Sequence, residues 1–276
     1  MNYHNLTIGL IGGGNMARAL VRGLLRSGHP AQHIRVAEPD ADQRALVAAL
    51  DAGLLLDANN TPVAQDAAAL VLAVKPQILP AVAAALAGQR RPSGQLVISV
   101  AAGITLASLD GWLGAGTPLV RVMPNQPATI GAGVSALAAS AAVDTAGRQL
   151  AEYVASTTGR ALWLPDETMM DAVTAVSGSG PAYFYLLMEL MERAAIDLGL
   201  PPDLAAALTR ETALGAARVV VETHGEPGLL RAAVTSPGGT TAAALQVFAQ
   251  ADLAGIVQQA LTAARNRSAE LGKQRS

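Results

Sequence analysis

The sequence predicts an α/β N-terminal domain with a mostly parallel sheet, followed by an all-helical C-terminal domain. Three observations lead to this fold class. The chain has 276 residues, more than most single hydrophobic cores accommodate. Short apolar runs alternate with helical patterns through the first part of the chain, and that alternation stops near Leu164. We therefore expect one domain over residues 1–164 and a second over residues 165–276.

The first domain is expected to contain strands separated by helices, so that the strands run parallel and helices cover both faces of the sheet. Apolar runs predict strands at Leu6–Ile11, Ile34–Ala37, Leu70–Val74, Leu96–Val100, Leu119–Val122, Val134–Leu137 and Ala161–Leu164. Apolar residues at helical spacing predict helices at Met16–Ser27, Asp42–Leu50, Ile78–Leu86, Leu106–Leu113 and Asp144–Ser156.

The second domain follows a helical pattern over residues 171–274, interrupted at SGSGP, GLPPD, GEPG and SPGG. Two of its segments, residues 184–198 and 204–221, carry apolar side chains on more than one side. A domain of this size offers too few partners to bury all of them. We therefore expect the second domain to pack against another subunit.

Composition and charge exclude several classes of protein. The net charge is −2 and the pI is about 6.1, so no basic surface is expected for nucleic acid. No cysteine is present, which rules out disulfides and thiolate nucleophiles, and a reducing cytoplasm is the simplest compartment. The four histidines are scattered, so we expect no metal site. The most apolar helical stretch contains charges such as Glu189 and Arg193, which argues against a membrane span.

A glycine-rich loop follows the first predicted strand in the sequence IGLIGGGNMARAL. Gly12, Gly14 and Ala17 have the spacing GxGxxA, in which the first glycine permits a tight turn and the second lets the backbone approach a pyrophosphate. The phosphates would meet the N-terminus of the helix that begins near Asn15 or Met16. Many such turns only connect a strand to a helix, but the position after the first strand favours a dinucleotide site in a Rossmann-like domain.

Glu38 ends the second predicted strand, where an acidic residue commonly binds the adenosine ribose hydroxyls of NAD. Its carboxylate would repel the 2′-phosphate of NADP. Two alternatives remain open. Glu38 could be a solvated acid in a turn, or Arg35 or Arg44 could move in to bind NADPH.

Two later strand ends could also contact a cofactor. The sequence LAVKPQ places Lys75 at the end of a central strand, although a surface lysine is the simpler interpretation. The sequence ISVAAGIT opens at Ala101 and Ala102 into a turn of small residues that would admit a flat nicotinamide.

Conventional acid–base and nucleophilic groups are few in this chain. No GxSxG motif occurs, and Ser177 follows no strand and has no histidine near it in the sequence. A nucleotide loop with so few catalytic groups favours hydride transfer to a substrate that is already electrophilic, because positioning and electrostatics then do most of the work.

Several longer motifs resemble the pyrroline-5-carboxylate reductase family. They are IGLIGGGNMA, LAVKPQ, SVAAGI, RVMPNQPA, DAVTAVSGSGPAYFYLLMEL, VTSPGGTTAAAL and the final RNRSAEL, which together extend over almost the whole chain. The resemblance implies NAD(P)H-dependent reduction of the cyclic imine 1-pyrroline-5-carboxylate to L-proline, the last step of proline biosynthesis. It also implies a helical domain that interlocks with its copy in a homodimer, often within a ring of dimers.

The resemblance also assigns contacts residue by residue. Cofactor contacts fall on Gly12, Gly13, Gly14, Asn15, Met16, Asn60, Ala73, Lys75 and Pro76. Substrate contacts fall on Ser236, Gly238, Gly239, Thr240 and Thr241.

The substrate carboxylate is expected to be the fixed handle of the imine. Backbone N–H groups of Gly238, Gly239 and Thr240, with the Ser236 hydroxyl, would form an anion-binding nest at a helix N-terminus. Thr241 is expected to be the catalytic residue that orients the ring nitrogen. Ser177 is also expected to bind the substrate. It belongs to the SGSGP sequence, which either lets a helix start close to the nicotinamide or serves only as an N-cap with tight glycine packing.

Three positions depart from the family pattern. Glu38 stands where NADPH-using members often carry serine or asparagine, so the choice between NADPH and NADH stays open. Gln126 replaces a frequent threonine, and Glu211 replaces a frequent glutamine and adds a charge near the expected interface.

Two other functions fit parts of the sequence. A β-hydroxyacid dehydrogenase pairs similar domains but relies on a lysine in the helical domain, and no lysine lies between Lys75 and Lys273. A non-enzymatic dinucleotide sensor would need the first glycine loop but not SPGGTT with its matching SGSGP.

Overall fold

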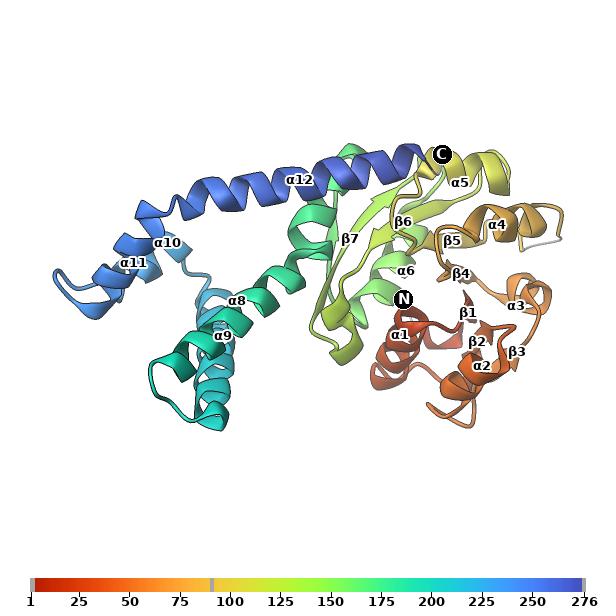
Figure 1. Cartoon of the computed structure of the whole chain (residues 1–276). Helices are drawn as coiled ribbons and strands as arrows, with labels where there is room; N and C mark the ends of the chain where they lie inside the picture. The colour runs from red at the N-terminus through yellow and green to blue at the C-terminus, as the bar shows by residue number, and fades with distance from the viewer. Residues whose placement is uncertain (1–2, 90–91, 275–276) are drawn as a thin grey trace. The chain divides into compact units, whose positions relative to one another are not determined.

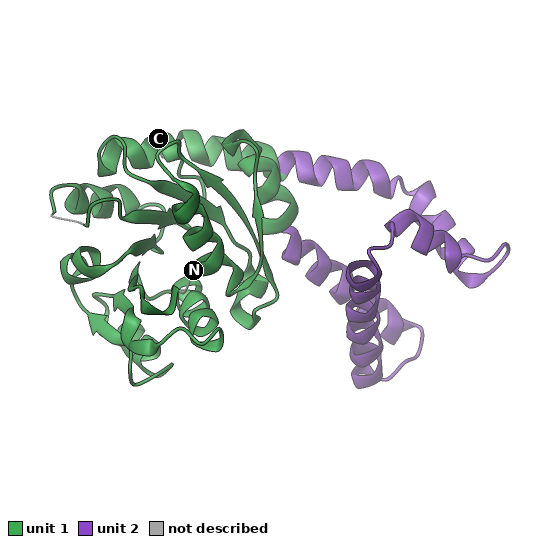
Figure 2. Ribbon diagram, turned by 180° about the vertical axis from the view of Figure 1, so that it is seen from behind, with its two compact units in different colours: residues 1–179, 264–276 green, residues 180–263 purple. Residues whose placement is uncertain are grey.

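The computed structural model describes residues 3–89 and 92–274, and their contacts divide the chain into two compact units (Figure 1, Figure 2). Unit 1 comprises residues 1–179 and 264–276, and unit 2 comprises residues 180–263. The contacts thus divide the chain later than the boundary expected at residue 164. The reason is that the segment after residue 164 packs on the sheet, where Met170 is 1% exposed and lies against Ala136 and Ala138.

Unit 1 is built on one sheet that is parallel except for the β6–β7 pair. Its strands are β1 (Ile8–Ile11), β2 (Ile34–Ala37), β3 (Leu55–Asp57), β4 (Ala69–Leu72), β5 (Leu96–Ser99), β6 (Leu119–Met123), β7 (Gly133–Ala139) and β8 (Gly159–Trp163). They lie in the order β3-β2-β1-β4-β5-β6-β7-β8. The predicted α/β domain with a mostly parallel sheet is confirmed, although the sequence missed β3.

Helices cover both faces of this sheet (Figure 1). They are α1 (Asn15–Arg26), α2 (Ala41–Ala48), α3 (Asn60–Asp66), α4 (Leu79–Ala87), α5 (Leu106–Leu113), α6 (Thr145–Ser156) and α7 (Met170–Val173), with shorter turns η1 (Tyr3–Asn5), η2 (Ala31–His33), η3 (Gln126–Ile130) and η4 (Glu167–Met169). Alternate strand residues enter different cores. Leu10 and Val71 pack with α1 and α6, whereas Ile11 and Leu72 pack with α3, α4 and α5. Burial on both faces explains the continuous apolar runs of β1, β4 and β5.

The sequence SGSGP interrupts the α-helical pattern, as the sequence predicts, and a π-helical turn fills the break. The chain passes from α7 through a π-helical turn, η5 (Thr174–Gly178), and continues into α8 (Gly180–Asp197). The Ser179 N–H donates to the Thr174 carbonyl at 2.8 Å, the i→i−5 bond of a π turn. A Cβ on Gly178 would lie 2.5 Å from the Met123 methyl group. The glycine therefore allows close packing on β6 at the point where the π turn ends.

Unit 2 consists of helices. They are α8, α9 (Pro202–Thr223), α10 (Pro227–Ala233), α11 (Thr240–Gln250) and the first half of α12 (Leu253–Lys273). The predicted breaks at GLPPD, GEPG and SPGG are confirmed. A further break at Asp252, with φ of +51°, separates α11 from α12 and was missed. Among the described residues no single helix is long and apolar enough to cross a membrane, although the bent pair of α11 and α12 meets that test by length and composition.

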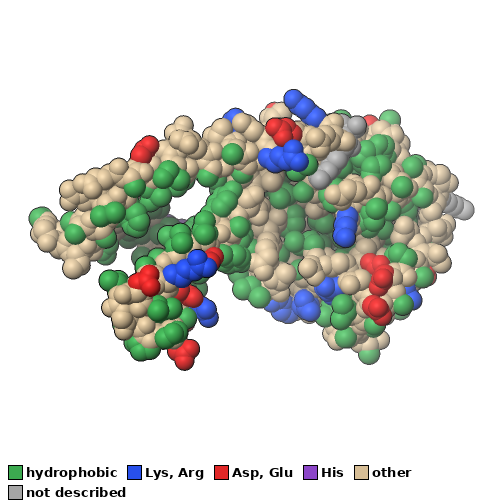
Figure 3. Space-filling model, in the orientation of Figure 1, with side chains coloured by type: hydrophobic (Ala, Val, Ile, Leu, Met, Phe, Trp, Pro, Cys, Tyr) green, Lys and Arg blue, Asp and Glu red, His purple; other side chains and the backbone are tan. Residues whose placement is uncertain are grey.

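Large apolar side chains lie exposed on the helices of unit 2 (Figure 3). They include Phe184, Tyr185, Leu186, Leu190, Leu208, Leu214, Val221, Leu229, Val247, Phe248 and Ile256. α8 and α9 contact each other, and Arg210 and Glu192 form an ion pair of 2.9 Å between them. A surface with this much exposed apolar area is typical of a subunit interface. This agrees with the expectation that the helical domain packs against another subunit.

His29 is a buried histidine whose charge state should affect stability. It follows α1, is 2% exposed, and its Nδ1 lies 3.0 Å from the Tyr153 hydroxyl of α6. Burial lowers the pKa of His29 below its ordinary value of 6.5, and the neighbouring His4 also lowers it. The unfolded chain then binds more protons than the folded one just below pH 6.5. The stability contribution is complete above that pH and is lost as the pH falls toward the lower folded pKa.

We expect the free energy of unfolding, measured by urea denaturation, to fall between about pH 7.5 and pH 5.5 in the wild type. His29→Asn should show a shallower pH dependence, because it removes the titrating group. His224→Asn is the matched control, since His224 is exposed and its φ of +52° suits asparagine. Equal slopes for wild type and His29→Asn would contradict the prediction.

Candidate active site

The glycine loop between β1 and α1 passes directly against the end of β4. Gly12 has a φ of +99°, and a Cβ there would lie 2.8 Å from the Ala73 carbonyl oxygen. The Gly12 N–H donates to the Ala37 carbonyl at 2.8 Å, and the Ala73 N–H donates to the Ile11 carbonyl at 2.9 Å. Only glycine combines this conformation with so close an approach. The loop is therefore fixed between the ends of β2 and β4.

The first turn of α1 is open. Gly14 caps the helix with backbone in the extended region and no side-chain hydrogen bond, and a Cβ on Gly14 would meet nothing within 4 Å. The free N–H groups of a helix start and the positive end of its dipole attract anions. Gly12, Gly14 and the start of α1 thus have the geometry that a pyrophosphate needs.

Arg18 is a residue near the loop that sequence reasoning missed. Its guanidinium donates to the Gly13 carbonyl at 2.9 Å, to Gln43 Oε1 at 2.7 Å and to Asn15 Oδ1 at 2.6 Å. These contacts join α1, α2 and the loop. No motif marks this arginine, because its role depends on a glutamine from the next helix.

Glu38 faces the glycine loop. Its Oε2 accepts a hydrogen bond from the Gly13 N–H at 2.7 Å, and its Oε1 accepts one from the Asp40 N–H at 3.0 Å. A carboxylate at the end of the second strand of such a unit is of the type that binds ribose hydroxyls. Of the two arginines considered, Arg35 pairs with Asp66 at 2.7 Å on the α3 side.

Arg44 remains next to the acid. Its guanidinium donates to the carbonyl oxygens of Glu38 at 2.7 Å and Pro39 at 3.1 Å. Arg44 thus stays beside the acid, whereas Arg35 is held by its ion pair with Asp66.

The other predicted cofactor residues lie at the carboxyl ends of neighbouring strands. Lys75 and Pro76 follow β4, with Lys75 exposed, and Ala101 and Ala102 follow β5. Asn60 begins α3 after β3, on the far side of β2. The strand order reverses its direction between β1 and β4, where open α/β sheets bind their ligands. Unit 1 thus brings the predicted cofactor residues to the side of the sheet where the parallel strands have their carboxyl ends.

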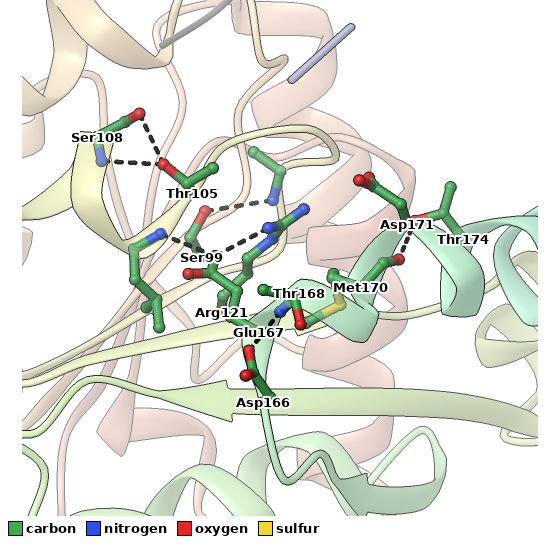
Figure 4. Close-up of polar contacts among 12 residues, drawn as sticks. Ser99, Thr105, Ser108, Arg121, Asp166, Glu167, Thr168, Met170, Asp171 and Thr174 are labelled. Carbon is green, nitrogen blue, oxygen red and sulfur yellow. Dashed lines mark hydrogen bonds and ion pairs between the residues drawn. The ribbon is translucent and has the colours of Figure 1, made fainter. Parts of the chain in front are cut away.

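An ion pair fixes the next part of this edge (Figure 4). Arg121 of β6 is 6% exposed, and its NH1 lies 2.8 Å from Oε1 of Glu167 in η4. The same carboxylate oxygen accepts the Leu106 N–H at 2.9 Å, at the start of α5. Thr105 caps that helix by accepting the Ser108 N–H at 3.1 Å. Sequence reasoning did not single out Glu167.

The predicted substrate loop lies in unit 2, at the start of α11. Gly238 has a φ of +71°, and the Gly239 N–H donates to the Ser236 carbonyl at 3.1 Å. α11 begins at Thr240 and, like α1, has no side-chain cap. The N–H groups of its first turn are thus available to an anion.

Ser177 lies in the π turn of unit 1. Its hydroxyl donates to the Val173 carbonyl at 3.0 Å. It therefore lies inside the π turn, three residues before α8 begins at Gly180, and is not the N-cap that the sequence offered as one alternative.

Two family descriptions match the chain. "Pyrroline-5-carboxylate reductase dimerisation" matches residues 167–271, and "NADP oxidoreductase coenzyme F420-dependent" matches residues 7–103. A pyrroline-5-carboxylate reductase of Pseudomonas aeruginosa is 50% identical over 267 residues, which is 97% of each chain. The chain belongs to the pyrroline-5-carboxylate reductase family. This membership confirms the resemblance carried by SGSGPAY and SPGGTT, and it excludes the β-hydroxyacid dehydrogenase alternative.

Other members of the pyrroline-5-carboxylate reductase family support the same assignment. One from Haemophilus influenzae is 42% identical over 268 residues, covering 96% of this chain and 97% of its own. The solved structure from Coxiella burnetii has a TM-score of 0.91 at 39% identity, covering 96% of this chain and 98% of its own. The Plasmodium falciparum structure with NADP bound has a TM-score of 0.86 at 27% identity, covering 98% and 99%.

Proposed function

We propose that the chain reduces 1-pyrroline-5-carboxylate to L-proline with a nicotinamide cofactor, the last step of proline biosynthesis. The observation that carries this proposal is the 50% identity with a pyrroline-5-carboxylate reductase over 97% of both chains. The uncapped starts of α1 and α11 support it. The reaction needs one anion site for a cofactor pyrophosphate and one for a small carboxylate, and each helix start supplies the chemistry of one.

The residues at the carboxyl edge of the sheet would hold the cofactor, which supplies the hydride when bound. The loop Gly12–Met16 would hold the pyrophosphate at the start of α1, and Glu38 would bind the adenosine ribose. Ala73, Lys75 and Pro76 follow β4, beside the loop. Asn60, Ala101 and Ala102 complete the set.

The start of α11 would hold the substrate. The N–H groups of Gly238 and Thr240, with the Ser236 hydroxyl, suit a carboxylate. The Gly239 N–H donates to the Ser236 carbonyl at 3.1 Å, so Gly239 would shape the turn around the substrate. Thr241 would orient the ring nitrogen of the imine. A protonated imine accepts hydride at carbon without further activation, so the chain needs to hold and orient it more than to exchange protons with it.

The assay that tests the proposal follows NADH and NADPH oxidation by the purified protein with 1-pyrroline-5-carboxylate. Proline should form in proportion to the cofactor oxidised. Cofactor binding without turnover would contradict the proposal and favour the dinucleotide sensor.

Glu38 is proposed to favour NADH over NADPH. Its carboxylate accepts the Gly13 N–H at 2.7 Å, so its charge faces the loop. Like charges a few ångströms apart repel by about 1 kcal/mol or more. Glu38→Ser should therefore raise the ratio of kcat/KM for NADPH to that for NADH by about tenfold.

The matched control for this variant is Asp40→Ser. It removes a negative charge two positions away, while serine can still cap α2 in place of Asp40, which accepts the Gln43 N–H at 2.8 Å. The cofactor ratio should stay close to that of the wild type. An equal change in both variants would show that overall charge, and not the position of Glu38, sets the preference.

The dimerisation match and the exposed apolar helices of unit 2 support a homo-oligomer. We propose an interlocked homodimer, assembled further into a ring of dimers, and a cytoplasmic location that suits a chain without cysteine. Size-exclusion chromatography with light scattering on the full chain tests the assembly. A monomer at micromolar concentration would contradict it.

A further inference from the structure

Glu167 joins three elements at the edge of the sheet. Its carboxylate, in η4, pairs with Arg121 of β6 at 2.8 Å and accepts the Leu106 N–H of α5 at 2.9 Å (Figure 4). The Arg121 side chain is 7% exposed and that of Glu167 is 25% exposed. A guanidinium so deeply buried requires a counter-charge, so Glu167 is not free to turn into solvent.

The start of α5 differs from the starts of α1 and α11. Two of its N–H groups are occupied by the protein, since Glu167 accepts that of Leu106 and Thr105 accepts that of Ser108. A carboxylate at a helix N-terminus is also favoured by the helix dipole. The start of α5 is therefore a fixed anchor and not an anion site.

The turn that this anchor holds is residues 100–105. It begins where β5 ends, contains Gly103 with a φ of +75°, and leads directly into α5. At its β5 end the Ala101 N–H donates to Ser99 Oγ at 3.4 Å. Glu167 thus fixes the downstream end of a turn whose upstream end is fixed by the sheet.

The end of α12 lies on the same turn. A Cβ on Gly272 would lie 3.7 Å from the Gly103 carbonyl oxygen. The Ser268 hydroxyl of α12 donates to the Asp171 carboxylate of α7 at 2.7 Å. Asp171 lies four residues after Glu167 in the sequence. The segment from η4 to α7 and the end of α12 therefore contact each other near this turn.

We propose that Glu167 is a positioning residue for the nicotinamide end of the cofactor, which acts by holding the turn 100–105 through the start of α5. Arg121 holds the Glu167 carboxylate in place. This inference rests on the proposed function, because the turn is the one expected to receive the nicotinamide. The adenosine end is held by the glycine loop and Glu38, which Glu167 does not contact.

The test compares Glu167→Gln and Glu167→Ala with the wild type in two assays. Steady-state kinetics give kcat and KM for the cofactor, and calorimetry gives the affinity for 2′-phospho-ADP-ribose, a fragment without nicotinamide. We expect kcat/KM for NADPH to fall about tenfold in Glu167→Ala and less in Glu167→Gln, which keeps an acceptor for the Leu106 N–H. The fragment affinity should stay within about twofold of the wild type.

Asp166→Asn is the matched control. Asp166 is the neighbouring acid and caps η4 by accepting the Thr168 N–H at 2.7 Å, but it is not one of the α5 contacts. This variant should retain wild-type kinetics. Unchanged kcat/KM in Glu167→Ala, or equal losses of kcat/KM and fragment affinity, would overturn the inference.

The result can be separated from a failure of the proposed function. If the wild type binds NADPH but does not reduce 1-pyrroline-5-carboxylate, the proposed function fails. In that case the affinities for NADP⁺ and for 2′-phospho-ADP-ribose, measured by calorimetry, still test whether the turn 100–105 positions the nicotinamide. A selective loss of NADP⁺ affinity in Glu167→Ala supports the inference, and parallel losses overturn it.

Discussion

Replacing Gly12 with alanine is expected to lower both the stability of the protein and its affinity for the cofactor. Gly12 has a φ of +99°, and a Cβ there would lie 2.8 Å from the Ala73 carbonyl oxygen and 3.0 Å from a methyl of Val74. Holding a non-glycine residue in such a conformation costs about 1–3 kcal/mol. We expect a loss of that size in the free energy of unfolding. Because relief of the contact would move the loop away from β4, NADPH affinity should fall about tenfold or more.

Alanine variants at two other glycines distinguish the effect of backbone strain on stability from the effect of cofactor contact on affinity. Gly14→Ala should leave stability within about 0.5 kcal/mol of the wild type, because its φ is −67° and its Cβ would meet nothing within 4 Å. It should still weaken NADPH binding, because that open space is where the pyrophosphate is expected. Gly114→Ala, with a φ of +102° beyond the end of α5, should lose stability but keep its affinity.

Urea denaturation and fluorescence titration with NADPH measure the two quantities. Wild-type affinity in Gly14→Ala would contradict the assignment of the α1 start to the pyrophosphate. Wild-type stability in Gly12→Ala would show that the loop relaxes without cost.

The central strands of the sheet can be predicted from the sequence, because both of their faces are buried and their residues are therefore continuously apolar. β2 was predicted at Ile34–Ala37, the bounds observed, and β5 differs by one residue at its end. β3 was missed because it has three residues at the edge of the sheet and Leu55 is 39% exposed. No periodic pattern can form in so short an exposed segment.

The glycines of SGSGP show a second limit of the sequence. A glycine in a helical pattern can end the helix or allow close packing, and the two roles have the same local sequence. Gly178 does both, because it is the last residue of the π turn and a Cβ on it would lie 2.5 Å from the Met123 methyl group. That contact joins β6 to a segment far along the chain, so local reasoning could not reveal it.

Some residues of the candidate site could be predicted from local sequence and others could not. Gly12, Gly14 and Glu38 were predicted because their spacing follows from one strand–helix–strand unit. Glu167 was not, because its partners Arg121 and Leu106 lie 46 and 61 positions away. A buried arginine on a strand indicates that an acid must face it, but only the fold shows which acid.

Thr241 is expected to make the largest side-chain contribution to the reaction. It lies in the first turn of α11 and is half-buried, and within the described residues no hydrogen bond holds its hydroxyl. The hydroxyl is thus available to the ring nitrogen of the substrate. Thr241→Ala should lower kcat/KM for 1-pyrroline-5-carboxylate. The fall should correspond to a loss of about 1–3 kcal/mol of transition-state stabilisation, as for the loss of one buried hydrogen bond.

Variants at Thr241 and its neighbour distinguish the hydroxyl from the shape of the side chain. Thr241→Val keeps the shape but not the hydroxyl and should lose as much activity as Thr241→Ala, whereas Thr241→Ser should keep most of it. Thr240→Val is the matched control, because Thr240 is exposed and is expected to act through its backbone N–H alone. Wild-type kcat/KM in Thr241→Val would refute the role of the hydroxyl. An equal loss in Thr240→Val would show that replacing either hydroxyl of the first turn by a methyl group disturbs the start of α11, and that the position of Thr241 is not special.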